Sequence, residues 1–279
     1  MLSLPAPAKL NLFLHITGRR PDGYHQLQTC FQLLDYGDRL DFRLTESAGI
    51  ELNCESDSEL GSLPPEDNLI VRAATLLQET TRATQGVSIQ LTKVLPTGAG
   101  LGGGSSDAAT TLLGLNKLWN CGLGDMQLAE LGLKLGADVP VFVYGRSGWA
   151  EGVGEKLSAM SLPERWYLVL TPDCHVATGQ IFSHEQLTRN SSPITIPAFP
   201  FSGTRNDCEA VVVELYPEIG AALKWLNKHA PARMTGTGSS IFASFGSRAA
   251  AEQVLAEIPQ ELKGFVAKGI NLSPVLLAL

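Results

Sequence analysis

The sequence has little that could build a disulfide framework or a zinc site. Its cysteines are widely spaced and odd in number, and none forms the C-x-x-C pair that zinc or redox chemistry prefers. A free cysteine usually packs as a small hydrophobic side chain. We therefore expect reduced structural thiols at Cys30, Cys54, Cys121, Cys174 and Cys208.

The chain also lacks a basic excess and a long apolar segment. Its 28 acidic residues outnumber 21 Lys and Arg, and the formal net charge of −7 opposes binding to a nucleic-acid backbone. No apolar run approaches the ~20 residues that span a bilayer. Residues 1–8 lack the basic and apolar regions of a signal peptide. We therefore expect a cytoplasmic protein, monomer or homodimer, that binds neither nucleic acid nor membrane.

What the chain does contain is enough apolar sequence for a full core. Its 279 residues are 44% hydrophobic and 18% charged, which suits two modest domains. Strand-like and helix-like patterns follow one another in mixed order, which favours an α+β fold over a regular alternation. We expect an N-terminal domain over residues 1–157 and a C-terminal domain over residues 158–279.

Local patterns predict the elements of these domains. Asn68 can cap a helix whose apolar residues recur at helical spacing, and the Pro and Gly within residues 19–23 suit a tight reversal. The predicted strands are 9–16, 31–34, 39–44, 50–54, 87–91 and 166–170. Further helices are predicted over 105–119, 126–135, 206–215, 219–229 and 248–258. The polar, Pro-rich residues 188–204 are predicted to form a surface loop.

The most informative segment is rich in glycine. Five of the seven residues from 98 to 104 are glycine, which costs conformational entropy and contributes no side-chain packing. Bare main-chain N–H groups can approach phosphate oxygens, and the helix predicted to follow directs its positive dipole end at the same place. The segment therefore predicts a loop that binds a polyphosphate.

Two other nucleotide loops and a loop without a ligand compete with this interpretation. A P-loop needs a Lys followed by Ser or Thr, but no Lys lies between Thr97 and Asn116. Gly98, Gly100 and Gly103 satisfy the dinucleotide pattern G-x-G-x-x-G, which needs a strand–helix–strand context. Here a second helix is predicted to follow the first, which disfavours a dinucleotide site. A flexible loop without a ligand stays open.

Residues 96–109 follow the pattern P-x-x-x-G-L-G-G-G-S-S-x-A-A, which resembles the phosphate-binding motif of the GHMP kinases. The resemblance implies a two-domain α+β GHMP kinase fold, with a ribosomal-S5-like α/β N-terminal domain and a ferredoxin-like C-terminal domain. It also implies ATP as co-substrate. Asp107 lies in the motif, and we expect it to stabilise the first turn of the helix. The implied ATP-binding residues are Asn68, Lys93, Pro96, Thr97, Gly98, Ala99, Gly100, Leu101, Gly102, Gly103, Gly104, Ser105 and Ser106.

Two charged residues in apolar surroundings are candidates for the chemistry. Phosphoryl transfer needs a positioned hydroxyl, neutralised phosphate charge and usually a carboxylate that orients or deprotonates the hydroxyl. Asp138 would be costly to bury without a cation, and Lys9 begins an otherwise apolar strand. Taken singly, Asp138 could be a turn or cap residue and Lys9 a solvent-facing one.

Motifs along nearly the whole chain resemble one branch of the GHMP kinases, which phosphorylates the 2-hydroxyl of a cytidine diphosphate-linked methylerythritol. The resemblance of G-A-D-V-P and P-A-K-L-N to that branch implies Asp138 as general base, with Lys9 keeping it ionised. It implies that Tyr24 stacks on the cytosine while His25 bonds its polar edge, although the two could merely pack beside a turn. The implied substrate-binding residues are Asn11, Tyr24, His25, Thr178 and Phe182.

Three expectations remain less specific. Mg²⁺ is expected with ATP, held by few protein groups and water, and likeness to other GHMP kinases suggests Ser106 as one ligand. The run Gly236-Thr237-Gly238 resembles a glycine loop that closes near the active site, but could be a tight turn. The alternatives for function are a GHMP kinase for mevalonate, homoserine or a sugar, and a non-catalytic nucleotide-binding regulator.

Overall fold

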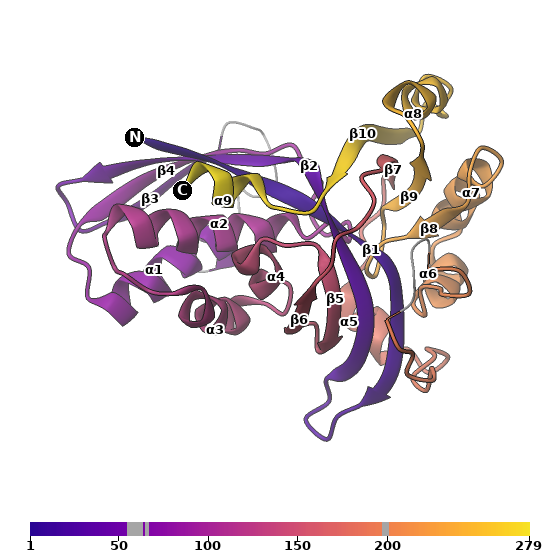
Figure 1. Ribbon diagram of the computed structural model, residues 1–279, viewed down its shortest axis with the longest axis horizontal. Helices are drawn as coiled ribbons and strands as arrows, with labels where there is room; N and C mark the ends of the chain where they lie inside the picture. Colours follow the sequence, from indigo (N-terminus) through magenta and orange to yellow (C-terminus); the bar gives the residue numbers. More distant parts are fainter. Residues whose placement is uncertain (55–63, 65–66, 197–200) are drawn as a thin grey trace.

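The computed structural model describes residues 1–54, 64, 67–196 and 201–279. Strands of both halves join in one sheet, ordered β3-β4-β2-β10-β7-β9-β8 along its main path, with β1 and β5 paired to β2 and β6 paired to β5 (Figure 1). Among the strand pairs of the described residues, β3–β4 alone is parallel. The strands are β1 (Leu2–Arg19), β2 (His25–Thr45), β3 (Ile50–Cys54), β4 (Gly86–Thr92), β5 (Gly148–Gly152), β6 (Lys156–Ala159), β7 (Trp166–Pro172), β8 (Ala232–Met234), β9 (Ile241–Phe245) and β10 (Leu262–Ile270).

Helices cover the faces of this sheet. The helices are α1 (Leu69–Thr81), α2 (Gly103–Leu118), α3 (Asp125–Leu135), α4 (Val139–Tyr144), α5 (Thr178–Ser183), α6 (Glu209–Leu215), α7 (Pro217–Leu226), α8 (Arg248–Leu255) and α9 (Pro274–Ala278). None of them, within the described residues, is long and apolar enough to cross a membrane.

A long hairpin of β1 and β2 runs through the molecule (Figure 1, indigo). The reversal lies where it was predicted, with Gly23 at φ 90° and the Arg20 N–H donating to the Tyr24 carbonyl. The strands predicted at 31–34 and 39–44 are a single strand, because Gly37 between them makes no turn. A Cβ on Gly37 would lie 2.1 Å from the Ala6 carbonyl oxygen, so close approach of β1 selects glycine there.

The helices α1 to α4 pack on the N-terminal part of the sheet (Figure 1). As predicted, Asn68 caps α1, since its Oδ1 accepts the Ile70 N–H at 2.9 Å. The helix α2 begins at Gly103, earlier than predicted, and no acid lies in its first turn. The expectation that Asp107 stabilises that turn is therefore wrong.

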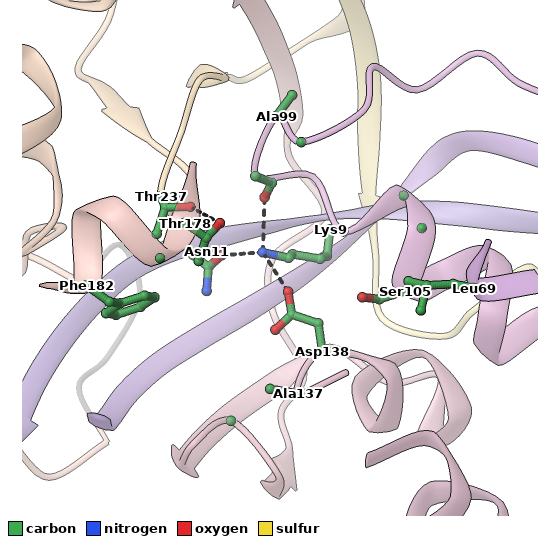
Figure 2. Close-up of a pocket in the computed structure, with 18 of the residues that line it drawn as sticks. Lys9, Asn11, Leu69, Ala99, Ser105, Ala137, Asp138, Thr178, Phe182 and Thr237 are labelled. Atoms are coloured by element: carbon green, nitrogen blue, oxygen red, sulfur yellow. Dashed lines mark hydrogen bonds and ion pairs between the residues drawn. The ribbon is translucent and has the colours of Figure 1, made fainter. Parts of the chain in front are cut away.

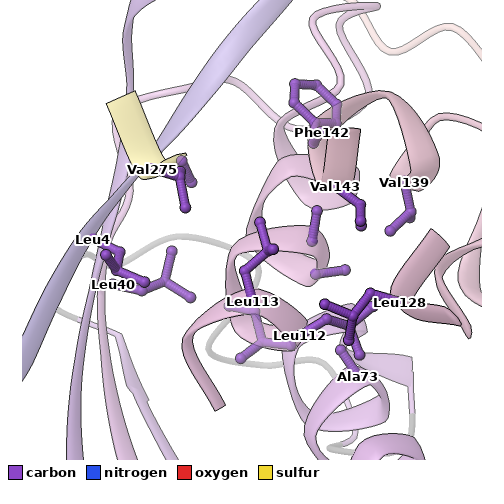
Figure 3. Packing of buried hydrophobic residues seen from close by; sticks show 14 of the residues in the cluster. Leu4, Leu40, Ala73, Leu112, Leu113, Leu128, Val139, Phe142, Val143 and Val275 are labelled. Atoms are coloured by element: carbon purple, nitrogen blue, oxygen red, sulfur yellow. The ribbon is translucent and has the colours of Figure 1, made fainter. Parts of the chain in front are cut away.

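The first hydrophobic core fills the space between these helices and the sheet. Figure 3 shows Leu112 and Leu113 of α2 between the strand residues Leu4 and Leu40 and Leu128 of α3. All five are buried. Burying a leucine contributes roughly 1.5–3 kcal/mol, so α2 is held chiefly by this core and not by its glycine-rich start.

The C-terminal half builds a second core from β7, β8, β9 and the helices α5 to α8. A third core joins the halves, where the Phe13 ring lies 5.6 Å from Trp149 and 5.6 Å from Phe201, measured between ring centroids. The strand β10 pairs with both β2 and β7, and Val275 of α9 returns to the first core. The division at residue 157 stays a prediction.

Some local predictions were incomplete. The short elements α4, α5, α9, β5, β6, β8 and β9 and the strand β10 were not predicted. The surface loop predicted at 188–204 is wrong in part, because Ser191 and Phe201 are buried; residues 197–200 of that prediction lie outside the described residues. All five cysteines are free thiols, as predicted.

Candidate active site

A cavity of about 920 Å³ lies where β1, the glycine segment, the start of α4 and the loop after β8 meet (Figure 2). Most of the residues predicted from the sequence line it. They are Lys9, Asn11, Tyr24, His25, Asn68, Lys93, Pro96, Thr97, Gly98, Ala99, Gly100, Gly102, Gly103, Gly104, Ser105, Asp138, Thr178 and Phe182.

Lys9 is the centre of the polar contacts in this cavity. It is 3% exposed, and its Nζ lies 3.3 Å from Asp138 Oδ2 at the start of α4 (Figure 2). Nζ also donates to Asn11 Oδ1 at 2.6 Å and to the Gly100 carbonyl at 3.0 Å. An ammonium has three N–H donors, so these three acceptors satisfy it and fix its position.

The glycine segment wraps around this lysine. The Lys9 N–H donates to the Leu101 carbonyl at 3.0 Å, which joins β1 to the segment. Gly100 and Gly102 have φ of 76° and 73°, a region that favours glycine. A Cβ on Gly100 would lie 2.3 Å from the Thr235 carbonyl oxygen. The segment therefore packs its backbone against neighbours that leave no space for side chains.

The start of α2 faces the same cavity. Its N-cap is Gly102, which has no side chain to accept the first N–H groups of the helix. Those N–H groups have no partner within the helix and carry its positive dipole end. Gly103, Gly104 and Ser105 line the cavity there, so the geometry suits an anion.

Two threonines orient Asn11. Its Nδ2 donates to Thr29 Oγ1 at 2.9 Å, which turns Oδ1 toward Lys9. The Thr29 hydroxyl in turn donates to the Phe13 carbonyl. From the other half of the chain, Thr235 Oγ1 accepts the Asn11 N–H at 2.9 Å and lies 3.2 Å from the Gly100 carbonyl.

A second buried cation lies beneath the glycine segment. Lys93 Nζ contacts the carboxylates of Asp38 and Asp107, the latter at 2.8 Å. Asp38 also accepts the Val94 and Leu95 N–H groups. Burial raises the pKa of Asp107 to about 7, with Lys93 opposing and Asp38 adding to the shift. Two acids and one cation here hold the end of β4 against α2.

The far end of the cavity is aromatic. The His25 and Phe182 rings stack with centroids 5.0 Å apart and an angle of 27° between planes. Tyr24 beside them is 62% exposed. The Thr178 hydroxyl lies 3.0 Å from that of Thr237, which joins α5 to the loop after β8. The cavity thus has the Lys9–Asp138 pair and the first N–H groups of α2 in one region and a flat aromatic wall at the other end.

Both halves of the chain are similar to known kinases. A model described as the GHMP kinases N terminal domain matches residues 68–146, and one described as GHMP kinases C terminal matches residues 199–264. The chain is 54% identical over 286 residues to a 4-diphosphocytidyl-2-C-methyl-D-erythritol kinase of Hahella chejuensis, covering 99% of this chain and 95% of that protein. The chain belongs to the GHMP kinase family.

Two further relatives agree with this assignment. A 4-diphosphocytidyl-2-C-methyl-D-erythritol kinase of Marinobacter nauticus is 55% identical over 279 residues, covering 98% of this chain and 96% of that protein. A crystal structure of a 4-(cytidine 5'-diphospho)-2C-methyl-D-erythritol kinase has a TM-score of 0.82 at 30% identity, covering 97% of this chain and all of that one. The predicted two-domain GHMP kinase fold with mixed α and β content is confirmed.

Membership of the GHMP kinases makes the protein a phosphotransferase that uses ATP as co-substrate. Two predicted ATP-binding residues have side chains that face the protein interior. Leu101 packs in the third core, and Ser106 is fully buried. Their roles, like those of the other predicted site residues, stay predictions.

The GHMP kinase site offers few groups for a metal ion. Among the described residues, no group of three or more acidic, His or Cys side chains could hold one. Asp138 and Asp107 each face a lysine. The buried Ser106 hydroxyl has no hydrogen-bond partner in the described part of the chain.

Sequence reasoning missed three residues of this site. Thr29 carries no signal of its own, because it is one polar residue in a strand. Asp38 was detectable as an acid beside Gly37 between two apolar runs. Thr235 precedes the Gly236-Thr237-Gly238 run, which lies beside the cavity as the resemblance implied.

Proposed function

We propose that this GHMP kinase transfers the γ-phosphoryl group of ATP to the 2-hydroxyl of 4-diphosphocytidyl-2-C-methyl-D-erythritol. The products would be the 2-phosphate and ADP, in cytoplasmic synthesis of isoprenoid precursors by the non-mevalonate route. The relatives named for this substrate span nearly the whole chain. The observation that carries the proposal is the Lys9–Asp138 pair in one cavity with the glycine segment and the His25–Phe182 stack.

In the proposed reaction Asp138 is the general base. Its carboxylate accepts the proton of the 2-hydroxyl while that oxygen forms a bond to the γ-phosphorus, and the bond from phosphorus to the β–γ bridging oxygen breaks. Lys9 is almost wholly buried beside it. The ammonium favours the ionised carboxylate and stabilises the negative charge that develops on the transferred group.

The triphosphate would lie on the glycine segment. The first N–H groups of α2, at Gly103, Gly104 and Ser105, would donate to phosphate oxygens. Asn68 and Lys93 line the nucleotide side of the cavity and are proposed to contact the adenosine. Because the Lys93 ammonium already serves two carboxylates, we expect it to shape this region more than to neutralise phosphate charge.

Magnesium fits this site as a companion of the nucleotide. We propose that phosphate oxygens and water supply most of its ligands, with the unpaired Ser106 hydroxyl as the protein candidate. When bound, the ion neutralises charge on the β- and γ-phosphates. Side chains of the protein serve the other roles in the proposed reaction: Asp138 takes the proton, Lys9 stabilises charge, and Asn11 orients the erythritol portion.

The aromatic end of the cavity favours a nucleoside-bearing alcohol over a small one. The His25 and Phe182 rings form a flat wall, and exposed Tyr24 is free to close over a base. Base–aromatic stacking contributes about 1–3 kcal/mol per base. Mevalonate, homoserine and galactose would leave this wall uncovered.

A coupled ADP-release assay tests the proposal. We expect ADP formation that depends on the cytidyl alcohol, with little or none on mevalonate, homoserine or galactose. ADP release with another alcohol alone would favour a different GHMP kinase activity. No alcohol-dependent release would favour a nucleotide-binding regulator.

The variant Asp138→Asn tests the base. We expect kcat to fall about 10²- to 10⁴-fold, the usual contribution of a general base. ATP affinity by titration calorimetry should persist, because the glycine segment is untouched. An Asp138→Asn protein with wild-type kcat would remove Asp138 from the mechanism.

A further inference from the structure

Arg189 lies behind the aromatic wall, in the segment between α5 and α6 that the sequence predicted as a surface loop. Its Nη2 donates to the carbonyls of Phe182 at 2.9 Å and His184 at 2.7 Å. Its Nη1 donates to the carbonyls of Leu187 and Glu185, and its Nε donates to His25 Nε2 at 3.2 Å. The five N–H donors of the guanidinium thus have five acceptors.

All five acceptors of Arg189 are neutral. Within the described ranges of the chain, no carboxylate lies within 4.0 Å of this guanidinium, although Arg39, Arg205 and Arg248 each have one. Here four of its N–H groups hold the backbone from Phe182 to Leu187, and the fifth points at one ring nitrogen of His25.

The hydrogen bond to His25 decides where the imidazole carries its proton. A ring nitrogen that accepts an N–H has no proton of its own, so the neutral ring must carry the proton on Nδ1. A second proton on Nε2 would face the Arg189 N–H directly. The charged groups that face His25 are Arg189 and Arg19 at the end of β1, both cationic. Burial, then Arg189, then Arg19 lower the pKa of His25.

We propose that Arg189 is a positioning residue for the base end of the site: it holds His25 as the neutral, Nδ1-protonated tautomer, stacked on Phe182. This rests on the proposed function, in which the wall receives an uncharged pyrimidine base. A neutral ring with a fixed Nδ1–H offers the base a hydrogen-bond donor and an apolar face. A freely titrating ring would offer a cation at mildly acidic pH.

The tautomer can be measured on the free protein, without substrate. In ¹⁵N-labelled wild-type protein, the long-range proton–nitrogen spectrum of His25, assigned by its loss in His25→Gln, should show protonated Nδ1 and unprotonated Nε2. The ring should stay neutral to a lower pH than an ordinary histidine, because burial and Arg189 lower its pKa. A wild-type ring protonated on Nε2 would overturn the proposal, and this measurement needs neither variant of Arg189.

Two variants connect the tautomer to the substrate. Arg189→Gln should shift His25 toward the Nε2-protonated form and raise KM for the cytidyl alcohol about ten-fold, with kcat and KM for ATP little changed. Arg189→Lys keeps the charge but cannot serve five acceptors, so it should behave like Arg189→Gln. As pH falls from 8, KM in Arg189→Gln should begin to rise near the ordinary histidine pKa, and KM in wild type should begin to rise only at a lower pH.

The exposed Arg248→Gln is the matched control, since it removes a guanidinium far from the cavity, and it should change none of these values. A folded Arg189→Gln protein with an unchanged His25 tautomer, or an equal loss of kcat and of ATP affinity, would overturn the positioning role. If the wild-type protein does not turn over the cytidyl alcohol, the proposed function is wrong. The proposed His25 tautomer is not affected by that result, because it is measured without substrate.

Discussion

At the scale of single residues, the candidate active site depends on how one amide is oriented. Asn11 Oδ1 accepts from Lys9 only because Nδ2 points the other way, toward the Thr29 hydroxyl. Thr29 is 1% exposed, and it influences the position of Lys9 through Asn11 without contacting a phosphate itself. If the side-chain amide of Asn11 rotated by half a turn, Lys9 would face an NH₂ group and lose one of its three acceptors.

The variant Thr29→Val tests this orientation. Valine keeps the shape of threonine but offers Asn11 no acceptor, so we expect kcat to fall about ten-fold, the effect of one hydrogen bond worth ~1.4 kcal/mol. KM for ATP should change little. Steady-state kinetics with both substrates varied measures the two effects separately.

Thr29→Ser is the control, because it restores the hydroxyl and should keep most of the wild-type kcat. If Thr29→Ser lost as much activity as Thr29→Val, the methyl group and not the hydrogen bond would be responsible.

At the scale of elements, the glycine segment works by its backbone. Between β4 and α2 it must pass the loop after β8 closely, and the Ser240 N–H donates to the Ala99 carbonyl at 3.1 Å. Gly100 lies at the contact, with a positive φ and no space for a Cβ. The shape of the loop is therefore fixed from the C-terminal half of the chain.

The variant Gly100→Ala should separate this contact from ordinary backbone strain. An added Cβ collides with the Thr235 carbonyl, so we expect the segment to move and KM for ATP to rise at least ten-fold. The left-handed backbone itself costs roughly 1–2 kcal/mol for an alanine. ATP affinity and thermal unfolding measure the two effects.

Gly122→Ala is the matched control. Gly122 has a similar φ of 70°, but nothing lies within 4 Å of its added Cβ. It should lose similar stability through strain and keep wild-type ATP affinity. Equal loss of ATP affinity in both variants would contradict a specific role for the Gly100 contact.

At the scale of the whole molecule, a buried acid makes stability depend on pH. The pKa of Asp107 is raised from an ordinary 3.8 to about 7, chiefly by burial. Between those values the folded protein retains a proton that the unfolded chain has lost. The folded state thus binds more protons, and this group makes the free energy of unfolding fall as pH rises from about 4 to 7.

The variant Asp107→Asn should remove that contribution. Urea unfolding at several pH values should show a free energy of unfolding that falls less steeply between pH 4 and 7 than in wild type. The exposed Asp173→Asn makes the same substitution at the surface and is the control. An unchanged slope in Asp107→Asn would mean that the carboxyl is ionised throughout this range.

The sequence by itself determined the features that a few neighbouring residues can specify. Asn68 fixes a helix start through a contact two residues away. Several glycines of the loop have positive φ, a conformation that glycine adopts more easily than other residues. The reversal at Gly23 is local for the same reason. The apolar surroundings of Lys9 and Asp138 identified both residues as unusual, and the family resemblance, not the local pattern, paired them.

Only the tertiary structure decided which groups meet. The Lys9–Asp138 pair and the contact of Arg189 with His25 join residues from separate elements. Thr235 reaches Asn11 from the opposite half of the chain. A hydrogen bond has a short range, so its partner depends on strand register and on how the halves pack. Local sequence patterns specify neither, which is why one long β2 was predicted as two strands and why the contacts of Arg189 were not predicted.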